Sequence, residues 1–333
     1  MKKSIVLTVL AAAVISSVPS LAVDVINPLS LPAKIDLNAY KDKAIEIVRL
    51  GLNDENPQIK MNAIEVVANT KSKELLPLVL NMTKSTSIMT RFAAAVALGD
   101  ANYSPATYSL KELLKDTDEN VRMAAAYSLI KMGDTESGLE AYILKGFIAS
   151  TDQTVKANAA MLLGKLGDKR ALPPLWKSFN SGSSNDRFRI QAVESIAMLK
   201  DEQIYNKIWG MLISKFVDDR IMGIRAMSAL GTLDAQHSIA TMLDDSIDDV
   251  KLCAACELGK FRDKAGEREV LDFLSRNSDR ISSLEQTPAS HMAIMAVGTI
   301  KSPRLNVYLP KLLENSQKDL QLAAAQSLLM NVR

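Results

Sequence analysis

The stretch Val121-Arg-Met-Ala-Ala-Ala-Tyr-Ser-Leu-Ile130 decides the fold, because copies of it recur along the chain. Two close copies begin at Val155 and Val250. Further copies begin at Ile59, Thr90, Phe188, Met222, Ala289 and Leu320, which places successive copies 28 to 39 residues apart. A recurring period of this size is the mark of a repeat architecture.

Two positions of the ten-residue motif hardly vary. The fifth position is alanine in all nine copies: Ala63, Ala94, Ala125, Ala159, Ala192, Ala226, Ala254, Ala293 and Ala324. The ninth position is always Val, Leu or Ile. Such a small residue at a fixed place predicts that two helix backbones approach each other there, because a larger side chain would hold them apart.

Each copy predicts one helix, since its apolar positions recur at steps of three and four residues. A second helix fits before it, for example over residues 75–82, 109–114 and 204–213. Polar turns between the two, such as Thr117–Asn120, supply oxygens that cap the second helix. The sequence therefore predicts an all-α protein, an α-solenoid of about nine helix-turn-helix repeats over residues 41–333.

The motif also predicts which face of its helix points where. Positions 1, 5, 9 and 12 are apolar and should face the other helix of the same repeat. Position 3 and the frequent glycine at position 10 should pack against the neighbouring repeat. Positions 4, 7 and 11 are mixed in character, so we expect them on an exposed inner face. Ala124 and Tyr127 belong to this third set.

The residues 118–129 and 152–168 resemble HEAT repeats, in the short form first described in phycobilin lyases, and Lys169–Leu175 is similar to the first-helix opening of that subclass. The resemblance implies a scaffold or adaptor rather than a particular activity. It also implies that the basic residue at motif position 2 pairs with the turn aspartate of its repeat, as Asp118/Arg122 and Asp152/Lys156 could. Gly223, Ser290 and Gln321 depart from that pattern.

The first residues predict an export signal. Lys2 and Lys3 precede an apolar run over residues 5–18, and Ser20-Leu-Ala22 has small residues where cleavage after Ala22 needs them. The run is shorter than the roughly 20 residues of a membrane span. We therefore expect a signal peptide over 1–22, an extended linker over 23–40, and a soluble exported protein, periplasmic or secreted, without stable membrane insertion after cleavage.

Charge excludes further classes of partner. Removal of residues 1–22 takes two of the 40 basic residues and none of the 38 acidic ones, which leaves a net charge near zero. Binding to nucleic acid or to anionic lipid is therefore not expected.

Signals for chemistry are few. The chain has only His237 and His291, and neither belongs to the His-Glu dipeptides that hold iron in the deoxyhypusine hydroxylases of this superfamily. Cys253-Ala-Ala-Cys256 has the spacing of a redox or metal motif, but it falls within a predicted helix, where packing is the better interpretation. Trp176 and Trp209 are interpreted as core residues. We expect no enzyme activity, no cofactor and no metal.

The sequence favours a non-catalytic scaffold or adaptor that binds a protein or peptide partner in the cell envelope through its concave inner face. Tyr127 would be the anchor, and the candidate partner-binding residues are Glu65, Val96, Tyr127, Asn158, Met161, Glu194, Met292 and Met295. Alternatives are an accessory subunit or lyase-like enzyme acting on an exported substrate, and soft-metal binding by Met and Cys of the C-terminal repeats. Leu322 and Leu329 have no further repeat to cover them, which predicts end-on association: either a homodimer or a partner covers this edge, or a short tail has been lost.

Overall fold

The nine motif copies form nine helices in the computed structural model, which describes residues 35–134, 138–180 and 186–332. These inner helices are α2 (Pro57–Thr70), α4 (Ile88–Asp100), α6 (Glu119–Lys131), α8 (Gln153–Leu166), α10 (Asp186–Met198), α12 (Val217–Leu230), α14 (Asp248–Lys260), α16 (Pro288–Ile300) and α19 (Lys318–Asn331). The described residues contain no strand, so the predicted all-α solenoid is confirmed.

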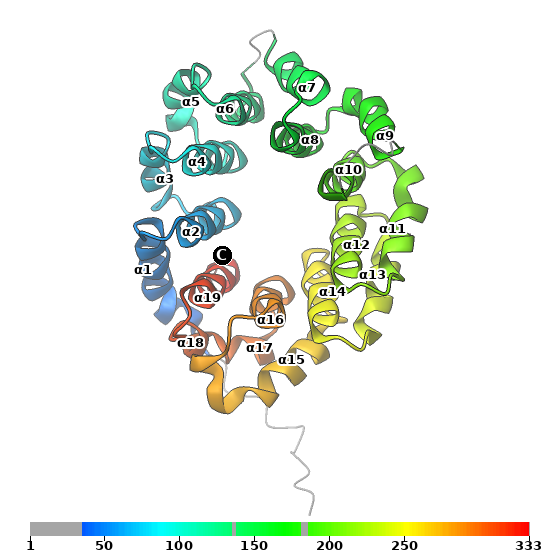
Figure 1. The fold of residues 1–333 in the computed structure, drawn as a ribbon. Helices are drawn as coiled ribbons and strands as arrows, with labels where there is room; N and C mark the ends of the chain where they lie inside the picture. The colour runs from blue at the N-terminus through cyan, green and yellow to red at the C-terminus, as the bar shows by residue number, and fades with distance from the viewer. Residues whose placement is uncertain (1–34, 135–137, 181–185, 333) are drawn as a thin grey trace, which may run out of the picture. The chain divides into compact units, whose positions relative to one another are not determined.

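A shorter outer helix precedes each inner one (Figure 1). The longer outer helices are α1 (Lys41–Leu52), α3 (Leu76–Met82), α5 (Thr107–Leu113), α7 (Leu139–Ala149), α9 (Leu172–Asn180), α11 (Tyr205–Leu212), α13 (Leu233–Thr241) and α15 (Glu267–Arg276). Before α19 the outer position is divided between α17 (Pro303–Asn306) and α18 (Leu309–Leu312). Short 3₁₀ turns lead into several of them, beginning with η1 (Leu37–Tyr40).

Polar turn residues start the inner helices as expected. Asp118 precedes α6, and its Oδ1 accepts hydrogen bonds from the backbone N–H of Asn120 at 2.9 Å and of Val121 at 3.3 Å. Asp152 caps α8 in the same way. These bonds satisfy donors that have no partner inside the helix, so α6 and α8 begin at their turns. The helices α12, α14 and α19 begin without a side-chain cap.

Glycine at motif position 10 lets neighbouring inner helices touch through their backbones. A Cβ on Gly99 of α4 would lie 2.6 Å from Cα of Ser128 on α6. The Ser128 hydroxyl donates to the Ala95 carbonyl at 2.7 Å across the same contact. Gly231 differs, because it ends α12 with a φ of 71° and so serves as a left-handed cap.

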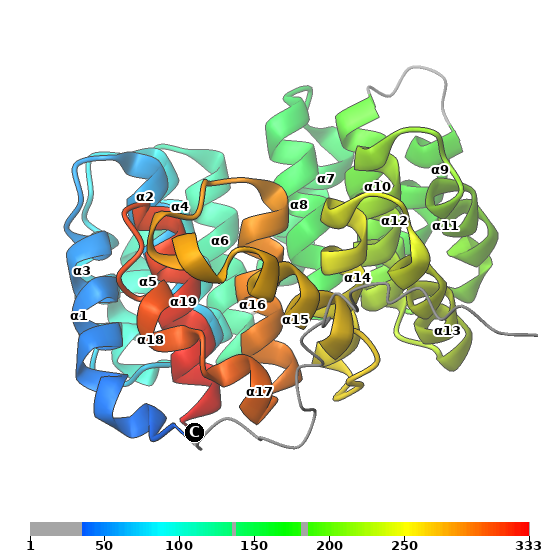
Figure 2. The same ribbon diagram turned by 90° about the horizontal axis from the view of Figure 1, so that it is seen from below.

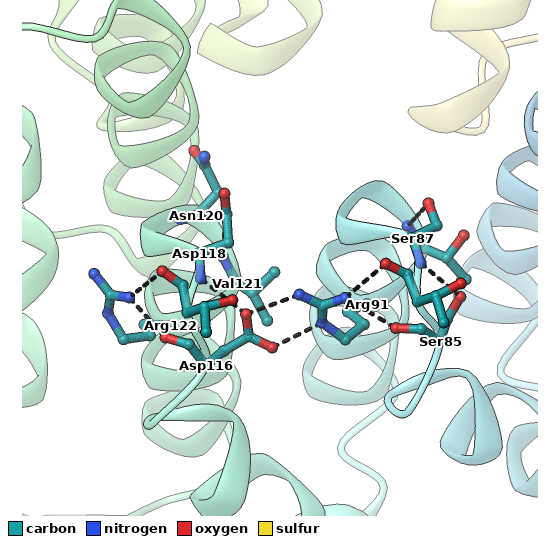
Figure 3. A network of polar contacts seen from close by, with 11 residues as sticks. Ser85, Ser87, Arg91, Asp116, Asp118, Asn120, Val121 and Arg122 are labelled. Carbon is teal, nitrogen blue, oxygen red and sulfur yellow. Dashed lines mark hydrogen bonds and ion pairs between the residues drawn. The ribbon is translucent and has the colours of Figure 1, made fainter.

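Arg91 and Arg220 each join two successive repeats, and each also donates to a backbone carbonyl in the turn of its own repeat. Arg91 of α4 makes a bidentate contact with Asp116, in the turn of the next repeat, with Nε–Oδ2 at 2.7 Å and Nη2–Oδ1 at 2.9 Å (Figure 3). Arg220 and Asp245 repeat this pair. The expected Asp118/Arg122 pair is wrong: Arg122 instead donates to the Asp116 and Thr117 carbonyls and to the Tyr142 hydroxyl, because Asp118 is occupied as a helix cap.

The sixth copy lies in a different register from the one that the alanine column indicates. A Cβ on Gly223 would lie 2.9 Å from Cδ2 and 3.2 Å from the backbone N of Leu212 in the outer helix α11, so Gly223 occupies the close approach expected of position 5. The Arg220–Asp245 pair is offset by 25 residues, as is Arg91–Asp116. This copy therefore begins at Asp219, and Ala226 is not its fifth residue.

The array of residues 35–332 closes on itself. Each inner helix contacts the next, and α19 in turn contacts both α1 and α2 (Figures 1 and 2). Asn62 of α2 donates to Asp319 Oδ1 at 2.7 Å, which repeats the relation between Asn158 of α8 and Asn120 of α6 at 2.9 Å. The first repeat therefore follows the last one as any repeat follows its predecessor.

Closure overturns the expectation of an open C-terminal edge. Leu322 and Leu329 are only 2% and 6% exposed. A Cβ on Gly51 of α1 would lie 3.0 Å from Leu322 Cδ2, so the first repeat covers the face that was predicted to need a second copy.

Three smaller expectations also fail. Ala124 is fully buried, although position 4 was assigned to an exposed face. Trp209 is partly exposed, whereas Trp176 packs on the core and donates to Asp201 Oδ2 at 2.8 Å. Of the predicted extended linker, residues 37–40 form η1 with Leu37 buried; residues 1–34 lie outside the described ones. None of the described helices is long and apolar enough to cross a membrane.

Candidate functional site

A cavity of about 740 Å³ lies among the inner helices α2, α10, α12, α14, α16 and α19. Its wall is formed by Glu65, Asn69, Glu194, Met198, Arg225, Ser228, Ala229, Cys256, Glu257, Lys260, His291, Met292, Met295, Thr299, Gln326 and Met330. Most of these residues occupy motif positions 7 and 11, so the assignment of those positions to an inner face holds for this half of the array. We refer to this space as the central cavity.

Four of the eight predicted partner-binding residues line the central cavity: Glu65, Glu194, Met292 and Met295. The other four do not. Val96 and Met161 are partly buried and pack against the core. Asn158 is partly buried and is bonded to Asn120.

Tyr127 is not an exposed anchor. Its side chain is fully buried, and its hydroxyl donates to Asp100, which also pairs with Lys165. Burial and this carboxylate together raise the pKa of Tyr127. The residue joins α4, α6 and α8 through this contact, so Val96, Tyr127 and Met161 belong to the packing between repeats.

The charged side chains of the central cavity are Arg225, Lys260 and the three glutamates Glu65, Glu194 and Glu257. Arg225 is exposed and makes no hydrogen bond or ion pair with the residues that the structure describes. Burial raises the pKa of Glu194, while the positive charge of Arg225 acts in the opposite direction. Glu257 is already neutralised, because Lys260 Nζ lies 2.6 Å from its Oε1. Arg225 is therefore the cation in this wall that is available to an anionic ligand.

His291 lies on the α16 side of the same wall. Burial lowers its pKa, and the carboxylates Glu65 and Asp319 act against that shift. The imidazole is therefore neutral at pH 7.

Sulfur is concentrated in the central cavity. Met198, Cys256, Met292, Met295 and Met330 come from four different helices and share its wall. Cys253 and Cys256 are both free and buried, as the packing interpretation predicted. Desolvation raises the pKa of Cys256 to about 11 and that of Cys253 to about 12, which leaves both thiols protonated at pH 7. Among the described residues, no group of three or more His, Cys, Asp and Glu side chains is arranged to hold a metal ion.

The sequence analysis did not single out Arg225, although the alignment on Ala226 placed it at position 4, which was also assigned to the inner face. With the copy beginning at Asp219, Arg225 falls at position 7, the position of Glu65, Glu194 and Met295 in their own copies. The spacings between motif copies already indicated the register that begins at Asp219. The intervals of 34 and 28 residues around Met222 add up to two intervals of 31, which is the commonest spacing in the chain.

Comparison with known proteins supports the architecture. The profile of HEAT repeats matches residues 45–130 and 140–228, more than half of the chain. The bilin biosynthesis protein MpeU of Synechococcus sp. (strain WH8020) is 33% identical over 85 residues, which are 24% of this chain and 29% of that protein. The chain thus matches less than a third of the length of this curated relative.

Two solved structures are similar in fold. The complex of CpcE and CpcF of phycocyanin lyase from Nostoc sp. PCC7120 is 17% identical, with a TM-score of 0.42, over 75% of this chain and 97% of that one. Human deoxyhypusine hydroxylase is 14% identical, with a TM-score of 0.36, over 89% of this chain and 98% of that one. At these values the likeness concerns the repeat architecture alone.

The comparisons agree with the resemblance to HEAT-like repeats of the phycobilin-lyase type. The expectation that an enzymatic role is absent is wrong by comparison with the curated relative, which is a bilin biosynthesis protein. That expectation rested on the absence of catalytic motifs from the sequence. A repeat protein that acts by holding a ligand for a partner would carry no such motif.

Proposed function

Because the chain belongs to the HEAT-repeat family, we propose that it is a lyase-like protein that holds a linear tetrapyrrole in the central cavity and presents it to a protein partner. The observation that carries the proposal is the central cavity itself. Its volume of about 740 Å³ lies within the range of small-molecule sites. Its wall combines an unpaired arginine with a band of sulfur side chains.

The two parts of this wall fit the two parts of such a ligand. The guanidinium of Arg225 can bind a propionate carboxylate through paired hydrogen bonds. Met292, Met295 and Met330 offer flexible, polarisable contacts to the faces of conjugated rings. The protonated Cys256 thiol is a poor nucleophile, so we expect the chromophore to stay non-covalent on this chain and any covalent bond to form on the partner.

A titration with biliverdin, followed by visible absorbance and circular dichroism, tests this function. Arg225→Gln should weaken binding by about tenfold, because one charge-assisted contact is lost. Arg268→Gln is the matched control, since Arg268 is an exposed cation on the outer helix α15. Denaturing extraction should release all of the chromophore. Absence of saturable binding, or equal losses in both variants, would contradict the proposal.

Soft-metal binding is a second candidate, favoured by the five sulfur side chains in one wall. Thioether sulfurs would be the ligands, with the neutral imidazole of His291 beside them. Competition of the purified protein with a chromogenic copper(I) chelator measures it. Met292→Leu combined with Met295→Leu should abolish binding, whereas Met211→Leu, outside the cavity wall, should not.

Export is part of the proposal and rests on the N-terminal sequence. Cleavage after Ala22 should leave a mature protein that begins at Val23. Intact-mass measurement of the protein purified from cell fractions tests this. An uncleaved chain in the cytoplasm would place both the protein and its partner there.

A further inference from the structure

A second hollow of about 490 Å³ lies between α9, α10 and α11, where the outer helices of two successive repeats face each other (Figure 1). Its apolar part is formed by Phe179 of α9, Ile190 and Val193 of α10, and Met211 of α11. None of the described residues in its wall belongs to the central cavity. We refer to this space as the outer groove.

Gly210 of α11 lines the outer groove and has no packing role within the chain. Seven other glycines lie inside the described helices, and for each of them an added Cβ would meet an atom within 3.1 Å: Gly51, Gly99, Gly146, Gly164, Gly223, Gly259 and Gly298. Nothing lies within 4 Å of the Cβ position of Gly210. Because glycine inside a helix costs stability, the space above Gly210 is better explained by a molecule that enters the groove than by the fold.

Apolar side chains are exposed beside the outer groove, at a place where other repeats carry a helix cap. Asp118 and Asp152 cap α6 and α8, whereas Phe216 precedes α12 and makes no capping bond with its side chain. Phe216 is 59% exposed, and Ile213 in the same turn is 70% exposed. The Phe216 N–H donates at 3.2 Å to the hydroxyl of Ser214, which lines the groove. This turn therefore gives up a stabilising cap and presents apolar surface instead.

The charged side chains of the outer groove are mostly cationic. Lys207 is exposed and makes no hydrogen bond or ion pair with the residues that the structure describes. Arg189 is exposed as well, and Asp219 already accepts a hydroxyl hydrogen bond at 2.6 Å within its own turn. Just outside the wall, the exposed Lys215 and Asp218 offset each other. The excess of positive charge in the wall favours an occupant that carries carboxylates beside its apolar side chains.

We propose that the outer groove binds an amphipathic helix of a protein partner, with its apolar face against Phe179, Ile190 and Met211 and its carboxylates toward Lys207 and Arg189. The described residues contain no strand, so the groove offers no sheet edge for an extended peptide to pair with. An occupant of an apolar groove must then satisfy its own backbone polar groups, which a helix does. The proposal does not depend on what the central cavity holds.

Fluorescence anisotropy with a labelled synthetic peptide tests the outer groove on the full-length protein. The probe is a helical peptide of about 20 residues with leucines on one face and glutamates along both margins of that face. The control peptide has lysine in place of every glutamate. We expect saturable binding of the glutamate peptide that weakens at about 1 M salt, and binding of the lysine peptide that is weaker by at least about tenfold.

Two variants with matched controls locate the binding. Gly210→Leu should weaken binding of the glutamate peptide by at least about tenfold, because its side chain occupies the groove. It should not lower the midpoint of thermal unfolding, because no atom lies within 4 Å of the Cβ position. Lys207→Glu should weaken binding by a similar factor. Ala141→Leu and Lys145→Glu, at exposed sites of the outer helix α7, should leave binding unchanged.

Phe216→Ser separates binding from stability. It should weaken peptide binding and raise the midpoint of thermal unfolding, since serine can cap α12. No saturable binding up to about 100 µM peptide, or equal binding by all variants, would overturn the docking site. A dimer that Gly210→Leu dissociates would make a second copy the occupant. Binding to phosphatidylglycerol vesicles that Gly210→Leu and Phe216→Ser abolish would assign the surface to a membrane. Either of these two results would contradict the proposed partner helix.

Discussion

At the scale of single residues, the helices pack closely because alanine and glycine carry few or no side-chain atoms where the helices meet. Ala125 is fully buried at position 5. We expect Ala125→Leu to destabilise the protein by about 1–3 kcal/mol through overpacking. Ala124→Leu should cost a comparable amount, because that residue is buried as well. Urea denaturation measures both. Ala141→Leu, at an exposed site on α7, is the control that should change little.

Gly99 provides a second test of the close packing between helices. An added Cβ would lie 2.5 Å from Ser128 Oγ and 2.6 Å from Ser128 Cα, and a backbone atom cannot rotate away. Gly99→Ala should therefore cost about 1–3 kcal/mol although alanine is the better helix former. Gly210→Ala is the matched control, since nothing lies within 4 Å of its Cβ position in α11. The control should stabilise the protein by about 0.5–1 kcal/mol in the same thermal melts, and a loss of stability in both would contradict this packing.

At the scale of elements, the inter-repeat ion pairs make stability depend on pH. The hydrogen-bonded guanidinium of Arg91 lowers the pKa of Asp116. A carboxyl whose folded pKa is depressed stabilises the protein above its unfolded pKa of about 3.9 and loses that contribution as pH falls through the folded value. Asp116→Asn should therefore cost about 3 kcal/mol at pH 7, because it leaves a largely buried arginine without its charge partner.

The difference in unfolding free energy between wild type and Asp116→Asn should shrink as the pH is lowered below about 4. Urea titrations at a series of pH values measure it. Glu112→Gln, which removes an exposed pair with Lys115, should have almost no effect at any pH. A difference that stays the same at every pH would mean that Asp116 acts by packing alone.

The sequence predicts the elements well and their lateral contacts poorly. Helix periodicity and caps such as Asp118 are local properties, and both helices of most repeats follow from them. The exposure of Tyr127 could not be read from its motif position, because its burial depends on Asp100 and Lys165 in two neighbouring repeats. Arg225 is a related case: its assignment to position 7 rather than position 4 depends on a register that the close approach of Gly223 to α11 sets.

At the scale of the whole array, closure replaces the capping repeats that an open solenoid needs. We expect the protein to remain monomeric at tens of micromolar in sedimentation experiments, because Leu322 and Leu329 are covered within the same chain. Leu322→Glu should lower the melting temperature, since it buries a carboxylate against Gly51 of α1. Leu233→Glu, at a site that is 72% exposed, should not. A dimer that Leu322→Glu dissociates would restore the end-on interface.

Closure also means that the position of the chain ends in the ring is not fixed by the arrangement of the repeats. The start of α1 at Lys41 and the end of the described chain at Val332 border the same surface depression. A short linker could therefore join the two ends, and new termini could be opened in an exposed turn such as the one that contains Thr117. Circularly permuted genes of this kind would encode the same ring, and each would move the chain break to a different pair of neighbouring repeats.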